Sequence, residues 1–180
     1  MIKGSYSEID GKDWIIGDNY KVKLSRASSG QQESFPMLMV LMLNTVERKN
    51  IGDYFFIEEP EAHLFPDAQN IITSLLSMLK HEMNTGFFIT THSPYILSAI
   101  NNAILANEVI KKNNLTIEKY ISLSDGAYPI DLNDISAFAI DNGNITDIKD
   151  YEYNMIGSDI LDSVSNEFGQ VMDQLLELDN

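Results

Sequence analysis

Two adjacent carboxylates, Glu58 and Glu59, directly follow the apolar and aromatic run of residues 54–57 and precede Pro60. Such a run is typical of a central strand in a parallel sheet, and open α/β sheets bind ligands beyond the carboxyl ends of their strands. In nucleotide hydrolases, one acid at this edge holds magnesium through water, and the next activates the attacking water. Glu58 and Glu59 are candidates for these two roles, and the alternative is a solvated acidic turn.

A histidine follows the next apolar run, within the segment Thr90-Thr91-His92-Ser93-Pro94. From this position an imidazole can reach the charge that develops on a γ-phosphate and can order the attacking water. A lone histidine in such a segment is better interpreted as a polar residue that caps the start of the next helix. Because His92 comes one strand after the paired glutamates, we favour the catalytic interpretation.

The third pattern is Ala27-Ser28-Ser29-Gly30-Gln31, which leads into a dense apolar stretch from Phe35 to Val46. A hydroxyl group, a glycine backbone and the start of a helix together form a common anion site. Serine–glycine loops are frequent, so this pattern is weak by itself.

The elements that must position these residues follow from hydrophobic spacing. The sequence predicts a hairpin, with strands at 14–16 and 20–24 around the turn Gly17-Asp18-Asn19, and a helix over 35–46 with Pro36 near its start. It then predicts a strand at 53–57, a helix from Pro66 that ends at Gly86, a second buried strand at 87–90, and a helix from Pro94 through Ile100. This alternation predicts an α/β fold with a right-handed parallel unit.

The residue pattern changes beyond Leu115, where the apolar pieces become shorter. Short β-like pieces stand at 119–123 and 137–140, and turn residues at 141–144 precede a further apolar piece at 145–148. Apolar residues from Asp159 to Leu178 have the spacing of an amphipathic helix. We expect one domain over 1–180, with a core at 24–110 and the β pieces and this helix at 111–180.

The composition restricts the class of protein. The chain has 180 residues, 44% of them hydrophobic, and a formal net charge of −15 from 27 acidic and 12 basic residues. An acidic surface repels phosphate backbones, so we expect no nucleic-acid binding by this chain itself. The sequence has no cysteine, its first residues lack the apolar segment of a signal peptide, and its longest apolar run, 37–43, is too short to span a bilayer. A cytoplasmic protein without membrane contact is expected.

In combination and in this order, the three patterns resemble those of the ABC-type ATPase superfamily. Residues 27–31 resemble the signature motif, with Ala27 in place of leucine and Ser29 in place of the first glycine. Residues 57–60 resemble Walker B, with Glu58 in place of the usual magnesium-holding aspartate. The resemblance implies that Glu59 is the catalytic base and that His92 is the switch histidine.

Residues 61–64, Glu-Ala-His-Leu, fall where this superfamily has its D-loop. The variant motifs are similar to those of the soluble ABC-like AAA ATPases, near the chromosome-maintenance, recombination-repair and OLD-type proteins. The resemblance implies a parallel-sheet P-loop NTPase fold and the cofactors ATP and magnesium. It also implies a head-to-head homodimer in which Ser28, Ser29, Gly30 and Gln31 contact the ATP of the facing head.

The printed sequence contains no Gly-x-x-x-x-Gly-Lys-Ser/Thr segment, which is the Walker A loop that cradles ATP phosphates. The chain is therefore expected to be a truncated piece, one half of a split protein, or a degenerate relative, and its expected partner is an N-terminal Walker A portion. Alone it is expected to be inactive.

Two other functions compete with an ATPase half-site. The chain could be a non-catalytic dimerisation or regulatory module of a split ATPase, although such a module has no need of both Glu59 and His92. It could also be the ATPase part of an OLD-like defence or DNA-repair protein. Nuclease activity in this chain itself is not expected, because the acids at 131–134 have the wrong spacing for a Toprim site.

Overall fold

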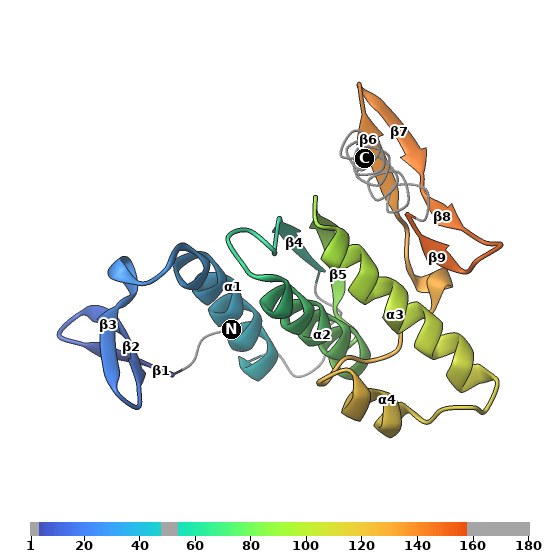
Figure 1. Ribbon diagram of the computed structural model, residues 1–180. Helices are drawn as coiled ribbons and strands as arrows, with labels where there is room; N and C mark the ends of the chain where they lie inside the picture. Colours follow the sequence, from blue (N-terminus) through green and yellow to red (C-terminus); the bar gives the residue numbers. More distant parts are fainter. Residues whose placement is uncertain (1–3, 48–53, 158–180) are drawn as a thin grey trace, which may run out of the picture.

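A pair of parallel strands covered by helices on one face forms the centre of the structure (Figure 1). The computed structural model describes residues 4–47 and 54–157. Strand β4 (Tyr54–Glu58) pairs in parallel with β5 (Gly86–Thr90), and helix α2 (Pro66–Met83) connects them. The α/β fold class and the parallel unit predicted from the sequence are therefore confirmed.

The chain before this unit forms an antiparallel sheet and a long helix. The elements are β1 (Ser5–Ile9), β2 (Lys12–Gly17), β3 (Tyr20–Lys23), the short 3-10 helix η1 (Leu24–Arg26) and α1 (Ser29–Glu47). Gly17 pairs with Tyr20, so the predicted hairpin is present, with Asp18 and Asn19 as its turn. The first strand, β1, was not predicted, because its residues are mostly polar.

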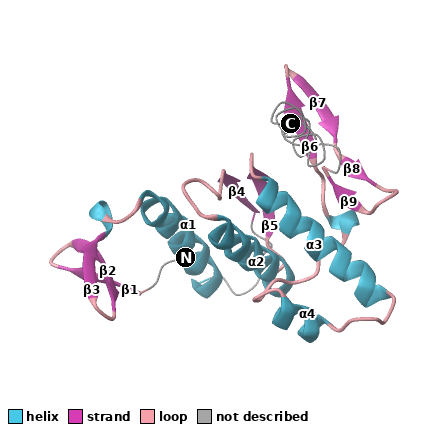
Figure 2. Cartoon of the chain, viewed as in Figure 1, coloured by secondary structure: helices cyan, strands magenta, loops and turns pink. Residues whose placement is uncertain are grey.

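The chain after β5 contains two helices followed by small antiparallel pairs, which flank the central helices (Figure 2). The elements are α3 (Pro94–Lys111), α4 (Ile117–Leu123), the 3-10 helix η2 (Leu132–Asp134), β6 (Phe138–Asp141), β7 (Asn144–Asp147), β8 (Lys149–Asp150) and β9 (Met155–Ile156). The β6–β7 hairpin agrees with the prediction. The helix expected at 159–178 lies outside the described residues.

Three predicted boundaries or types were wrong. Residues 119–123 are helical, not extended, because Thr116 caps the helix and Tyr120 packs into the core against Ala103 and Ala106. Helix α2 ends at Met83 and is capped by Asn84, which adopts the left-handed conformation (φ 50°), whereas Gly86 already begins β5.

The third correction concerns α1, which begins at Ser29, so that Pro36 lies inside the helix instead of near its start. Because proline has no N–H group, the carbonyl of Gln32 receives no helical hydrogen bond from residue 36.

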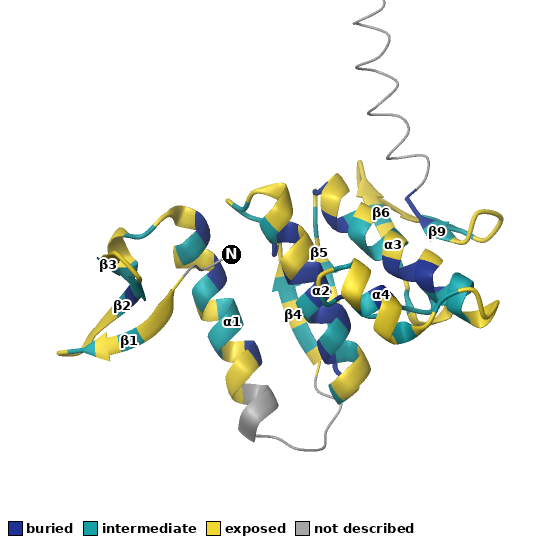
Figure 3. Cartoon of the chain, turned by 60° about the horizontal axis from the view of Figure 1, so that its bottom comes forward, coloured by how far each residue is buried: buried dark blue, intermediate teal, exposed yellow. Residues whose placement is uncertain are grey.

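The largest core cluster lies on only one face of the β4–β5 pair. Leu41 of α1 and Ile72, Leu76 and Leu79 of α2 are buried there, against inward-facing side chains of both strands. These strand residues are Phe55, Ile57, Phe87 and Ile89. Exposed and partly buried residues alternate along β4, and Phe88 and Thr90 of β5 are exposed (Figure 3), so the prediction that both strands are buried is wrong for their second face.

The exposed face of the β4–β5 pair is aromatic. Tyr54 is 78% exposed, Phe56 is 80% exposed and Phe88 is 60% exposed, and the rings of Phe56 and Phe88 lie 5.5 Å apart. All-parallel sheets are normally covered on both faces, and large exposed apolar patches mark interaction sites. Residues 4–47 and 54–157 therefore leave uncovered an aromatic face of a kind that parallel sheets usually bury.

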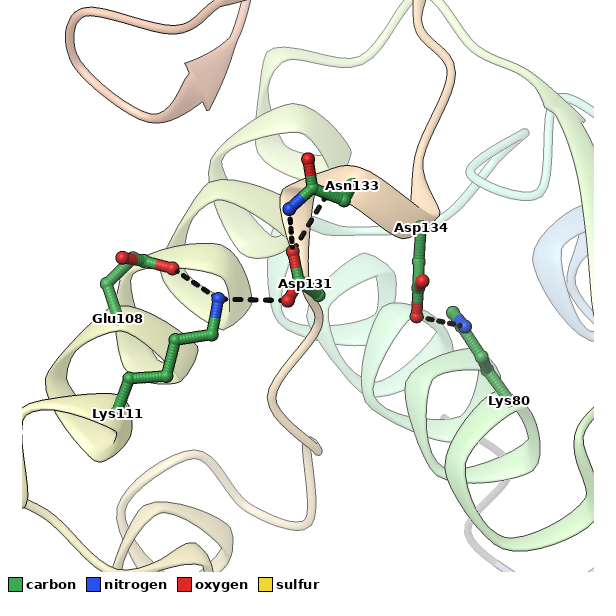
Figure 4. Close-up of polar contacts among 6 residues, drawn as sticks. All are labelled: Lys80, Glu108, Lys111, Asp131, Asn133 and Asp134. Carbon is green, nitrogen blue, oxygen red and sulfur yellow. Dashed lines mark hydrogen bonds and ion pairs between the residues drawn. The ribbon is translucent and has the colours of Figure 1, made fainter.

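Ion pairs join the segment after α4 to the ends of α2 and α3 (Figure 4). The ammonium of Lys111 lies 2.9 Å from carboxylates of both Glu108 and Asp131, and Lys80 lies 3.0 Å from Asp134. Hydrogen bonds from Lys111 and from the Asn133 backbone lower the pKa of Asp131 to about 2. These contacts hold η2 across α2 and α3, but they are partly exposed, so each contributes little stability.

No helix within the described ranges 4–47 and 54–157 is long and apolar enough to cross a membrane.

Candidate functional site

The loops that follow β4 and β5 begin side by side at the carboxyl end of the parallel pair. Glu58 pairs with Thr90, and the backbone N–H of Glu59 donates to the Thr90 carbonyl at 2.9 Å, which extends the ladder by one bond. Glu59 then adopts a left-handed backbone (φ 44°), which is uncommon for a residue other than glycine. The chain therefore turns sharply at the second carboxylate.

This turn brings Glu59 and His92 together. His92 Nε2 lies 3.5 Å from Glu59 Oε1, with the histidine side chain 88% exposed and the glutamate 48% exposed. The two side chains are thus near each other and open to a ligand, an arrangement that a general base and a charge-stabilising imidazole could use.

Glu58 lies on the exposed aromatic face of the pair. Side chains alternate along a strand, so Glu58 shares a face with Tyr54 and Phe56, and it is itself exposed. Among the residues that the structure describes, no three acidic or histidine side chains group into a metal site. A single carboxylate at a strand end suits magnesium, which usually takes one or two carboxylates and completes its shell with water and phosphate.

The predicted signature residues form the start of α1. Ser28 N–H donates to Gln31 Oε1 at 3.3 Å, and Gln31 N–H donates to Ser28 Oγ at 3.4 Å. This reciprocal pair is a capping box, in which serine and glutamine satisfy free backbone donors at a helix start. Ser28 and Ser29 are exposed and Gly30 is buried. The two serines are therefore accessible to a second molecule while Ser28 also caps the helix.

Gly30 packs directly against the predicted D-loop. A Cβ atom at this position would lie 2.6 Å from the His63 carbonyl oxygen and 2.9 Å from a methyl carbon of Leu64. Beside this contact, His63 Nε2 lies 3.4 Å from Glu33 Oε1. Only glycine allows this close approach between α1 and the loop at 61–64, which is a role that the sequence alone did not reveal.

Replacing Gly30 with alanine should destabilise the chain, because the added methyl group clashes with a backbone oxygen that cannot move aside as a side chain can. We expect a loss of about 1–3 kcal/mol in unfolding free energy, typical of overpacking. Urea denaturation of the variant measures it. Ser29→Ala at the exposed neighbouring position is the matched control and should leave stability nearly unchanged.

Several polar residues behind the site were missed by sequence reasoning. Thr91 and the backbone of His92 both donate to Glu61, while buried Gln69 and Ser93 hydrogen-bond to each other. The one available signal was Ser93-Pro94, a common start of a helix, and Ser93 Oγ accepts from the N–H groups of Tyr95 and Ile96.

Comparisons with known proteins agree with this fold and motif order. Residues 2–97 match the model of a family described as AAA ATPase domain. This match covers more than half of the chain, and the chain therefore belongs to that AAA ATPase domain family.

Individual relatives point the same way. The Old nuclease of Escherichia phage P2 is 34% identical over 101 residues, which are 53% of this chain and 17% of the nuclease. The chain thus spans about a sixth of the length of that relative. A solved structure from "Structural biochemistry of ATP-driven dimerization and DNA stimulated activation of SMC ATPases" matches 90% of this chain and 81% of its own, with a TM-score of 0.52 and 12% identity.

At that identity the likeness to the SMC ATPase concerns the fold. Together, the family match, the phage relative and the fold confirm the resemblance to ABC-like AAA ATPases of the OLD and SMC kind. The chain is an ATPase-family domain with a P-loop NTPase-like fold.

Proposed function

We propose that this chain is the ATP-hydrolysing half-site of an ABC-like ATPase, which a Walker A portion supplied outside these 180 residues completes. In the completed site Glu58 holds magnesium through water, Glu59 is the general base and His92 stabilises charge on the transferred phosphoryl group. ATP would supply the phosphoryl group that water attacks, and magnesium would neutralise its negative charge.

The observation that carries this proposal is the Glu59–His92 pair. Two side chains with complementary roles in phosphoryl transfer lie 3.5 Å apart, at the end of a parallel strand pair, and both are accessible. A chain that served only in dimerisation has no physical need to hold a carboxylate and an imidazole together in an exposed position.

The exposed aromatic face supports the second half of the proposal. Because Glu58 lies on the same face as Tyr54 and Phe56, a partner that covers the two rings also lies against Glu58. A Walker A portion placed there would extend or cover the sheet and bring the ATP phosphates toward the carboxylate that holds magnesium. Burial of these rings would also drive its association.

We further propose that two completed heads form a homodimer around ATP. Ser28 and Ser29 are exposed at the start of α1, where backbone N–H groups and hydroxyls favour an anion. Ser28, Ser29, Gly30 and Gln31 of one head would then contact the γ-phosphate bound to the other. The dimerisation named for the SMC ATPases supports this arrangement by analogy.

Adding the Walker A portion, as a second polypeptide or in a longer chain, should create ATP turnover that neither part has alone. Calorimetry should show weak binding of magnesium-ATP to the isolated chain, because Walker A supplies most ground-state phosphate contacts. Sub-micromolar binding by the isolated chain, or no turnover on completion, would contradict the proposal.

Phe56→Lys tests association with the Walker A portion separately from the folding of this chain. Phe56 is 80% exposed, so the substitution should barely change the stability of the isolated chain, yet it should block association with the Walker A portion. Ile145→Lys, at the 71% exposed Ile145 of the separate β6–β7 hairpin, is the matched control and should leave association intact.

A further inference from the structure

We propose that Glu61 is a positioning residue for His92, acting through a closed ring of hydrogen bonds between the loops that follow β4 and β5. The inference rests on the proposed function for the role of His92, but the ring itself is a property of this chain. Glu61 Oε1 accepts from Thr91 Oγ1 at 2.7 Å and from the His92 backbone N–H at 2.8 Å. Hydrogen bonds to an ionised acceptor are among the short and strong ones.

The ring continues from Thr91 back to Glu61 without a break. The N–H of Ser93 donates to Thr91 Oγ1 at 3.0 Å, and Ser93 Oγ donates to Gln69 Oε1 at 2.5 Å. Gln69 Nε2 donates to the Leu64 carbonyl at 2.9 Å, and the Leu64 N–H donates to the Glu61 carbonyl at 2.9 Å. Each loop is thus held by the other, and neither can shift alone.

Burial makes this ring rigid. Gln69 is 8% exposed and Ser93 is 7% exposed, so water cannot readily replace their hydrogen bonds. Glu61 Oε2 is buried and has no hydrogen-bond partner among the described residues, so Oε1 makes both of the hydrogen bonds by which this carboxylate joins the two loops.

The ring reaches both catalytic candidates. It holds the backbone of His92 directly. The N–H of Ala62 donates to the Glu59 carbonyl at 2.9 Å, and this turn joins Glu59 to the same loop. The 3.5 Å separation of Glu59 and His92 therefore depends on Glu61. Because Leu64 and the His63 carbonyl also abut Gly30, the same ring connects the signature helix to His92.

The direct test is amide hydrogen exchange by NMR on the full 180-residue chain. In Glu61→Ala the amide of His92 loses its acceptor and should exchange about 10-fold faster or more, whereas core amides such as that of Ile104 should not change. Glu61→Gln retains a carbonyl oxygen and should restore much of the protection. Glu82→Ala, at an exposed glutamate of α2, is the matched control and should leave the His92 amide unaffected.

If the exchange rate of the His92 amide is the same in Glu61→Ala as in the wild type, the proposal is wrong, whatever the ATPase activity of the variant. If that variant loses its fold, Thr91→Val decides, because it removes both hydrogen bonds of Thr91 Oγ1 and opens the ring, so that the His92 amide should again exchange faster than in the wild type. In the completed ATPase, Glu61→Ala should lower kcat at least about 10-fold with little change in KM, because Glu61 orients His92 without holding nucleotide. Absence of turnover in the wild-type assembly would refute the proposed function but not the exchange result.

Discussion

Replacing Glu59 with glutamine in the completed ATPase should lower the rate of ATP hydrolysis by about 100-fold or more, the usual loss when a general base is removed. Glutamine has nearly the same shape as glutamate but cannot accept the proton of the attacking water. Its side chain leaves the phosphate-binding contacts in place, so ATP binding and ATP-dependent dimerisation should persist. Single-turnover hydrolysis and size-exclusion chromatography with ATP measure the two effects.

Glu59 combines its carboxylate with a left-handed backbone, so the variant needs a structural control. Glutamine keeps the same backbone preferences, and the 48% exposed side chain makes few packing contacts, so the melting temperature should be unchanged. Wild-type turnover in Glu59→Gln would mean that another group is the base. If the melting temperature falls together with the activity, the loss of activity reflects a destabilised fold and not the loss of a base.

The local order of strands and helices around the site could be predicted from the sequence because each signal is short-range. The run at 54–57, the apolar spacing after Pro66 and the run at 87–90 correspond to β4, α2 and β5. Parallel pairing then places Glu58, Glu59 and His92 at one edge, where the side chains of Glu59 and His92 lie 3.5 Å apart in the structure.

The features that sequence reasoning missed depend on contacts between distant segments. Residues 119–123 alternate like a strand, but Tyr120 finds its packing partners on α3, and this tertiary contact stabilises a helix. The run at 54–57 looks buried on both faces, but its Tyr54 and Phe56 side chains are exposed in the structure, on the face that we propose a Walker A portion covers.

The residues that hold the candidate site in place could not be predicted from the sequence either. Glu61, Gln69 and Ser93 carry no motif that predicts a ring of hydrogen bonds, since the ring exists only when two loops and α2 are brought together. The tight contact of Gly30 with the His63 carbonyl is equally non-local. Spacing can identify residues that touch a nucleotide, but the residues that hold them in place become visible only in three dimensions.

A mixture of two inactive full-length variants should recover ATPase activity if the signature segment acts on the ATP of the facing head. Ser28→Arg places a bulky cation where the exposed serine would meet the γ-phosphate, so it should block formation of the sandwich without greatly weakening ATP binding to its own head. Glu59→Gln removes the base. Each variant alone should be nearly inactive, with losses of about 100-fold for the second.

The recovery follows from which head supplies each part. In a heterodimer, the Ser28→Arg head keeps its own Glu59 and borrows an intact signature from its Glu59→Gln partner, so one of the two sites is whole. If the heads paired at random, half of the assemblies would be heterodimers with one whole site each, so recovery on the order of a quarter of wild-type activity is expected for a symmetric dimer. If the signature instead served its own head, each site would carry one defect and mixing would restore nothing.

Ser28 also caps α1, so the loss of its hydrogen bonds must be separated from the block. Losing the cap should cost about 1 kcal/mol, whereas Ser28→Asn keeps a capping side chain without the bulk of arginine. Ser28→Asn should therefore retain both stability and dimerisation, while Ser28→Arg should lose dimerisation by more than its small drop in stability explains. Heterodimers that crosslink but show no recovered hydrolysis would place the signature in its own head's site and refute the trans arrangement.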